Sequence, residues 1–211
     1  MTPTRHVRAT STRKGMPMMK TILRRQLKRL GLASAAGLLL ASCGQEAAKP
    51  AMSYQEISDA LHAVMASDRT VYTQVIVNRL QNVEKVIKAS EHWKDDKALA
   101  LPAQMFRYGA EMVAKKTDKF SYQLLSLWPV NKQNKPRTEA ESAGLKFVAE
   151  NKGKNYYTTE TLGGKKYFTA VYADIAVAQA CVSCHNEHKD SPRTDFKMGD
   201  VMGGVVVRLP M

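Results

Sequence analysis

A Cys-x-x-Cys-His motif from Cys181 to His185 constrains this chain more than any other feature of its sequence. Two thiols three residues apart, followed at once by histidine, are the signature of covalent c-type haem attachment. Each thiol adds across one vinyl group of the porphyrin to form a thioether, and the adjoining imidazole is carried beneath the iron, where it binds. The motif therefore predicts one haem c, held by Cys181 and Cys184, with His185 as the proximal ligand.

Three alternative interpretations use the same residues. A thioredoxin-like redox pair would lie in a βαβ unit, and the sequence shows no such pattern. A structural zinc site could recruit His188 as its fourth ligand, but zinc ligands packed within about eight residues are unusual. A disulfide between Cys181 and Cys184 would account for the thiols but not for His185. Haem attachment explains all three motif residues together.

The N-terminal segment has the features of a bacterial export signal. Residues 20–29 are basic, and residues 31–41 form a short apolar stretch of small residues and leucines. Leu40 to Cys43 (Leu-Ala-Ser-Cys) resembles the lipobox of bacterial lipoproteins, in which the cysteine is acylated and becomes the mature N-terminus. Several acyl chains together hold a protein stably on a membrane. We therefore predict lipidation at Cys43.

The lipobox sets the expected domain plan and location. Residues 1–42 are the predicted signal peptide, residues 43–52 a small polar tether, and residues 53–211 a haem domain. Gly44 after the cysteine is typical of sorting to the outer membrane. We predict a lipid-anchored protein on the periplasmic side of a bacterial membrane, with the outer membrane favoured. The sequence has no run of apolar residues long enough for a permanent transmembrane helix.

The net charge of +13 does not indicate nucleic-acid binding. Nine of the 32 Lys and Arg residues, and none of the 19 Asp and Glu residues, lie in residues 1–42. The rest of the chain carries 23 basic and 19 acidic residues, so its net charge is small. Because the excess lies in the predicted signal peptide, we expect no nucleic acid among the partners.

An apolar stripe predicts a long helix at the start of the domain. From Ser53 to Ile87, apolar residues recur at steps of three and four, which is the spacing of one helix face. Ser53 and Glu56 fit a capping box. A helix of about 35 residues would reach about 50 Å, and helices of that length often pack on a partner chain. The pattern is compatible with a homodimer, and equally with two shorter helices that meet near Ser67.

The rest of the domain alternates short helices and strands. Helices are expected over residues 102–116 and 138–151, and strands over residues 120–128, 156–161, 167–172 and 201–209. Gly163 and Gly164 mark a hairpin turn. The haem motif is expected in a loop before the last strand. This order predicts an α+β domain, an antiparallel sheet with helices packed on one side.

The residues alone leave the sixth ligand of the haem iron open. Imidazole and thioether are the usual partners of a haem-bound histidine. For each methionine taken singly, core packing is the better default. His188 lies too close to His185 to reach the opposite face of the same haem, but it could bind a propionate. The candidates are His62, His92, His188, Met65, Met105, Met112, Met198 and Met202.

A set of segments spread over about residues 54–211 carries a more specific pattern. They are Val71–Thr73, Val77–Arg79, Leu101–Ala103, Leu125–Pro129 with Asn131 and Asn134, Cys181–His185 and Gly199–Val205. In combination they resemble the PAS-like c-type haem domain family. Members of that family occur as periplasmic sensor domains of chemotaxis receptors and histidine kinases, and as stand-alone monohaem cytochromes.

The resemblance implies a PAS-like five-stranded antiparallel sheet, long N-terminal helices and frequent dimers. It also implies His185 as the proximal ligand and a distal position filled by methionine, cysteine or water. Cys43 is assigned to lipid and the other two cysteines to haem, which excludes the cysteine-ligated type. By its position in the chain, Met105 matches the distal methionine of the family, so Met105 is the candidate second metal ligand.

Three functions are compatible with such a domain. A periplasm-facing monohaem cytochrome would transfer single electrons to a redox protein partner. A haem-based sensor of redox state or of NO, CO or O2 would act through a partner. An enzyme ranks last, because His92 and Arg107 are the only recognisable candidates for a distal acid–base pair. The sequence ends directly after the last expected strand, without a kinase or a methyl-accepting coiled coil, and this favours the electron carrier.

Overall fold

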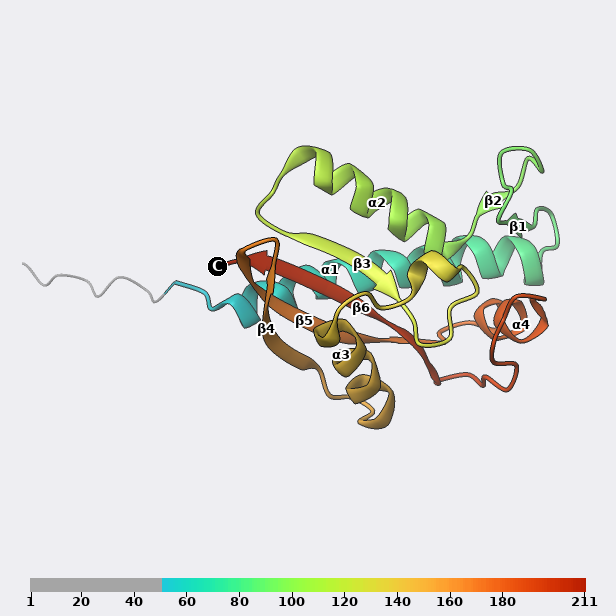
Figure 1. Cartoon of the computed structure of the whole chain (residues 1–211). Helices are drawn as coiled ribbons and strands as arrows, with labels where there is room; N and C mark the ends of the chain where they lie inside the picture. Colours follow the sequence, from blue (N-terminus) through green and yellow to red (C-terminus); the bar gives the residue numbers. More distant parts are fainter. Residues whose placement is uncertain (1–50) are drawn as a thin grey trace, which may run out of the picture. The chain divides into compact units, whose positions relative to one another are not determined.

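The structure, a computed structural model, describes residues 51–211 (Figure 1). Its helices are α1 (Tyr54–Val71), the π-helix η1 (Tyr72–Val83), α2 (Pro102–Lys116), the 3-10 helix η2 (Lys132–Asn134), α3 (Glu139–Glu150) and α4 (Gln179–Glu187). Its strands are β1 (Ala89–Ser90), β2 (Leu99–Ala100), β3 (Ser121–Leu125), β4 (Tyr156–Leu162), β5 (Lys165–Ile175) and β6 (Val201–Pro210). The predicted signal peptide, Cys43 and most of the tether lie outside the described residues.

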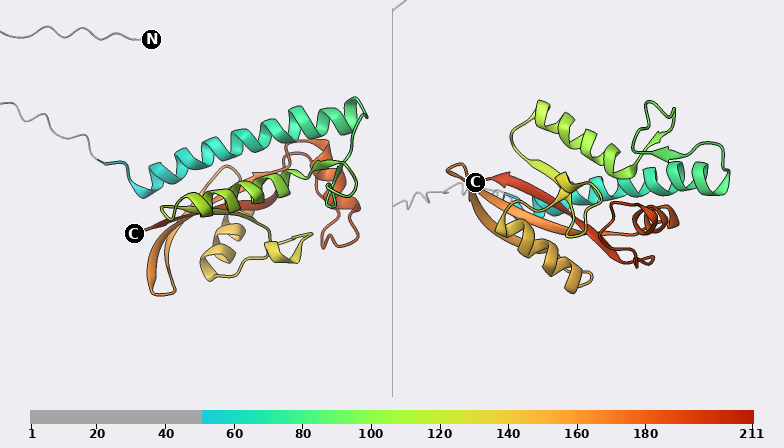
Figure 2. Two further views of the ribbon diagram at one scale, coloured as in Figure 1. Left: turned by 90° about the horizontal axis from the view of Figure 1, so that it is seen from above. Right: turned by 45° about the vertical axis from the view of Figure 1, so that its right-hand side comes forward.

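The N-terminal helix is long and starts at the predicted cap. The Ser53 hydroxyl accepts a hydrogen bond from the Glu56 N–H at 3.2 Å, and the Glu56 carboxylate accepts one from the Ser53 N–H at 2.7 Å. Near Ser67 there is no break, because α1 continues directly into η1, where the winding widens from α to π (Figure 2). Within residues 51–211, no helix is both long and apolar enough to span a bilayer.

The sheet has four antiparallel strands in the order β3-β6-β5-β4. β6 lies in its middle and is buried along nearly its whole length. The β4–β5 turn is formed by Gly163 and Gly164 at φ values of 56° and 79°, the left-handed conformation that a two-residue hairpin loop favours. The expected fifth strand is not part of this sheet, since β1 and β2 pair only with each other, in a two-residue parallel ladder.

Helices cover both faces of the sheet, so the prediction of helices on one side is wrong. Tyr172 and Val205 face α1 and α2, and they form one apolar cluster with Phe106 of α2. Their neighbours Val171 and Val206 point the opposite way, towards α3. Successive residues of a strand point to opposite faces, and in the middle of β5 and β6 both sets are apolar. A sheet that is apolar on both faces needs cover on both.

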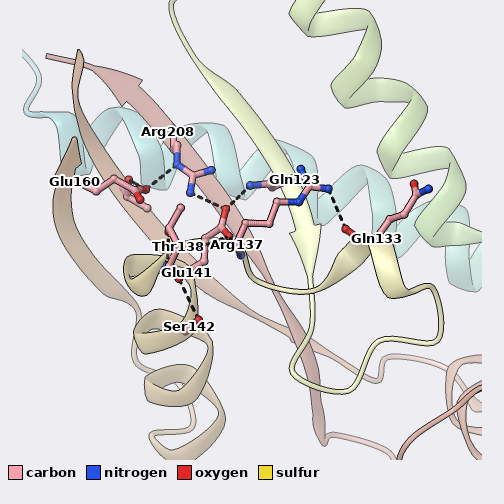
Figure 3. Close-up of polar contacts among 9 residues, drawn as sticks. Gln123, Gln133, Arg137, Thr138, Glu141, Ser142, Glu160 and Arg208 are labelled. Atoms are coloured by element: carbon pink, nitrogen blue, oxygen red, sulfur yellow. Dashed lines mark hydrogen bonds and ion pairs between the residues drawn. The ribbon is translucent and has the colours of Figure 1, made fainter. Parts of the chain in front are cut away.

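A buried polar network crosses the α3 face of the sheet (Figure 3). Arg208 of β6 donates to Glu141 of α3 at 2.6 Å and to Glu160 of β4 at 2.7 Å. Gln123 of β3 also donates to Glu141, at 2.7 Å. The network therefore links β6 and β4 to α3 through Arg208, and β3 to α3 through Gln123. Because each buried charge has charged and hydrogen-bonded partners, the cost of removing it from water is offset.

Candidate functional site

The Cys-x-x-Cys-His motif lies in helix α4, and not in a loop as the sequence predicted. Helical residues three and four apart are neighbours on the helix surface. Cys181, Cys184 and His185 occupy positions i, i+3 and i+4, so the helix gathers both thiols and the imidazole on one side. Both cysteines are free thiols, with Cys181 half-buried and Cys184 exposed.

The other side of α4 fixes the helix to the domain. Val182 is buried against Met202 of β6 and against Phe196, in a small apolar cluster next to the sheet. Asn186 clamps the following loop, because its amide nitrogen donates to the Phe196 carbonyl at 2.9 Å and its amide oxygen accepts from the Phe196 N–H at 3.0 Å. The backbone of α4 is therefore held from two directions.

The His185 imidazole lies edge-to-face against Phe196, with the ring centroids 5.8 Å apart and an interplanar angle of 88°. Burial is the main cause that lowers the pKa of His185, followed by the positive charge of Arg69 and by His188. A lowered pKa keeps the ring neutral at neutral pH. Neutral imidazole has the free lone pair that a metal ligand needs.

Two buried polar atoms in this region lack a partner. Within residues 51–211, His185 Nδ1 and Arg69 Nε are the buried side-chain nitrogen or oxygen atoms that make no hydrogen bond. Arg69, near the end of α1, forms an ion pair with Asp174 at the end of β5 through its Nη1 atom. An unsatisfied buried donor or acceptor costs about 1–3 kcal/mol, so this region favours a partner that the polypeptide does not supply.

Glu91 connects the end of α4 to the beginning of α2. Its carboxylate lies 3.8 Å from His188 Nε2, and its carbonyl accepts a hydrogen bond from the Gln104 side chain at 2.7 Å. Partial burial of the thiol, with Cys181 and the carboxylate of Glu91 adding to it, raises the pKa of Cys184. The Cys184 thiol therefore stays protonated at neutral pH. Through its contacts with His188 and Gln104, Glu91 also links the first turn of α2 to the end of α4.

The structure separates the candidates for the sixth ligand. Met65 and Met202 pack in apolar clusters, and Met112 and Met198 are exposed, as is His92. His62 stacks on Tyr172 over the sheet, with the ring centroids 3.9 Å apart. Met105 lies in the first turn of α2, directly after Gln104, and is half-buried, as are His62 and Met65. His188 is held by Glu91 beside the motif.

The residues on α4 are of the types that bind a haem. Two free thiols and a neutral imidazole share one side of a helix, and His185 Nδ1 is buried without a hydrogen-bond partner. In the described part of the chain, no three His, Cys, Asp or Glu side chains come together as a metal site. The zinc alternative therefore has no support from residues 51–211.

The sequence did not indicate a role in the site for four residues of this region: Arg69, Asp174, Glu91 and Phe196. Arg69 is one of several charged residues on a long amphipathic helix, and the sequence gives no reason to single it out. Of these four residues, Asp174 carries a signal that could have been detected, because it is an isolated acid at the end of an apolar strand. Its partner is 105 residues away in the chain, beyond the reach of any local pattern.

The sequence and the fold were compared with protein families, solved structures and curated proteins. The model of the Tll0287-like family matches residues 45–210. The solved structure described as that of the cyanobacterial heme-protein Tll0287 is similar to this one, with a TM-score of 0.50 and 14% sequence identity. The match covers 76% of this chain and 98% of that chain, and at this identity the likeness concerns the fold. No curated protein matches the chain significantly.

Proposed function

The chain belongs to the Tll0287-like family, and we propose that it is a haem protein with one covalently bound haem c. The observation that carries this proposal is the single side of α4 that holds Cys181, Cys184 and His185. The related solved protein is itself described as a heme-protein. Cys181 and Cys184 would hold the haem through thioethers, and His185 would ligate the iron. The bound haem would supply a one-electron redox centre.

Electron transfer is the activity that the surroundings of α4 support best. Cys184 is exposed, so the edge of a cofactor attached there would be open to a redox protein partner. His185 packs edge-to-face on Phe196, which is itself buried, and this contact limits movement of the iron ligand. A rigid ligand favours electron exchange because little rearrangement accompanies a change of oxidation state. A haem sensor of NO, CO or O2 is the alternative function.

Absorption spectra separate the carrier from the sensor. The carrier is expected to give a low-spin, six-coordinate spectrum in both oxidation states, because a second protein ligand fills the iron's last position. The reduced spectrum should not change when carbon monoxide is added. Pyridine haemochrome spectra of the same sample should show haem with two saturated side chains. A spectrum that shifts readily with carbon monoxide would contradict the carrier and support the sensor.

Met105 is the proposed distal ligand, and its replacement tests that assignment. In Met105→Ala, the weak far-red absorption band of the oxidised protein should disappear and the reduction potential should fall, because thioether ligation raises the potential. Met112→Ala is the matched control, since Met112 lies on the same helix and is exposed. If Met105→Ala changes neither the band nor the potential, another residue or water is the ligand.

The location and assembly are part of the same proposal. We propose a PAS-like domain, anchored through lipid at Cys43 on the periplasmic side of a bacterial membrane, with the outer membrane favoured. A second copy is a further proposed partner. Exposed valines along α1 and η1, including Val64, Val71 and Val75, support a homodimer because they leave an apolar stripe in contact with water.

A further inference from the structure

Arg69 lies outside the motif, on the long N-terminal helix, and has an unsatisfied buried nitrogen. Its helix is tied to the segment before α4, because Gln74 of η1 donates to the Val177 carbonyl at 3.0 Å. Views from two directions place α4 beside the far end of the long helix (Figures 1 and 2). Asp174, the ion-pair partner of Arg69, lies at the end of β5, and the chain runs from there directly into α4. Arg69 is therefore held beside the segment that leads into α4.

Asp174 engages one corner of the Arg69 guanidinium and leaves one edge free. The ion pair uses Nη1, and among residues 51–211 Asp174 is the side-chain partner of this guanidinium. Nε is buried and has no partner. Nε and Nη2 together form the edge of arginine that binds the two oxygens of a carboxylate. The free Nε edge of Arg69 is therefore suited to bind a carboxylate, and residues 51–211 do not supply one.

We propose that the Nε edge of Arg69 binds a propionate carboxylate of the haem held on α4. This inference rests on the proposed function, because the haem is the source of the carboxylate. The propionates are the anionic groups at the porphyrin edge, and burial strengthens their attraction to a guanidinium. Asp174 is a positioning residue, since it orients Arg69 and balances its charge. The Arg69–propionate pair then adds a non-covalent attachment point to the two thioethers.

The test compares the full-length holoprotein with two variants at this pair. Arg69→Lys keeps the positive charge and a partner for Asp174 but lacks the two-nitrogen edge. The double variant Arg69→Met with Asp174→Asn removes the contact without leaving a buried carboxylate unpaired. Arg79→Met is the control, because Arg79 lies on the same continuous helix and is about half exposed. For each protein, haem content, reduction potential and the propionate bending band in resonance Raman spectra are measured.

Haem content should be the same in all four proteins, because the thioethers hold the haem. The propionate band should shift in both Arg69 variants and not in Arg79→Met. In the double variant the equilibrium constant for reduction should fall at least tenfold, which corresponds to about 59 mV for a one-electron couple, and Arg69→Lys should lose less. An unshifted propionate band in both Arg69 variants overturns the contact, even if the potential falls. Absence of haem from the wild-type protein would overturn the proposed function itself.

Discussion

Replacing both Cys181 and Cys184 by alanine is expected to abolish covalent haem attachment. The wild-type protein should stain for haem after denaturing electrophoresis, because thioether bonds survive unfolding. The double variant should show no stain, since His185 alone gives a ligand bond that denaturation breaks. Each single variant keeps one thiol, and one thioether also survives unfolding, so any haem that a single variant binds covalently should still stain. The measurement is peroxidase-based haem staining of equal amounts of exported protein.

Ser183→Ala is the matched control for this experiment. Ser183 lies between the two cysteines on α4, and its hydroxyl has a 3.3 Å contact with the Gln179 side chain at the helix surface. Its replacement leaves both thiols and the imidazole in place, so the stain should persist. Haem that remains bound to the double cysteine variant after denaturation would disprove attachment at this motif. Loss of stain in Ser183→Ala would point to misfolding of the helix.

Replacing Arg208 by methionine is expected to destabilise the fold by about 3–5 kcal/mol, the usual cost of removing one partner from a buried ion pair. The Arg208 side chain lies between Glu141 and Glu160, and all three are almost fully buried. Without the guanidinium, two carboxylates would remain near each other out of water. Total stabilities of such domains are about 5–15 kcal/mol, so the loss is large. Urea unfolding of both proteins measures it, as a lower midpoint at unchanged slope.

The loss should depend on pH in a defined direction. In the wild type, burial raises the pKa of Glu160, but hydrogen bonds from Thr169 and Arg208 outweigh it and the net pKa is lowered. A lowered pKa gives stability that is present at neutral pH and lost as the pH falls through the folded-state pKa. In Arg208→Met, burial would act on Glu160 without the guanidinium and raise its pKa. The stability gap between the two proteins should therefore be larger at about pH 7 than at about pH 4.

Arg137→Met is the control for the network. Arg137 lies next to the network in Figure 3, but its guanidinium donates to the Gln133 carbonyl at the surface. Surface substitutions of this kind usually change stability by less than about 0.5 kcal/mol. An Arg208→Met protein that unfolds at the wild-type urea concentration would show that the network contributes little. A similar loss in Arg137→Met would show that the effect does not depend on burial.

Much of the fold could be predicted because its elements have local causes. The capping box at Ser53, the helix start at Pro102 and the hairpin at Gly163 and Gly164 each depend on residues within one turn of each other, and each prediction is confirmed. The α+β class followed from the order of the elements. Three predictions about the motif and the sheet were wrong, since the motif lies in a helix, α3 covers the second face of the sheet, and the sheet has four strands and not five.

The sequence by itself determined the chemistry that is available: two thiols and an imidazole at positions 181, 184 and 185, on a segment with no other free cysteines among the described residues. The tertiary structure decided what surrounds them. Arg69 and Glu91 are far from the motif in the chain, and they act on His185 and Cys184 only when the domain is assembled. The physical reason is that local patterns follow from steric and hydrogen-bonding preferences within a few residues. Burial, ion pairing and the pKa of His185 depend instead on which distant side chains exclude water from the same place.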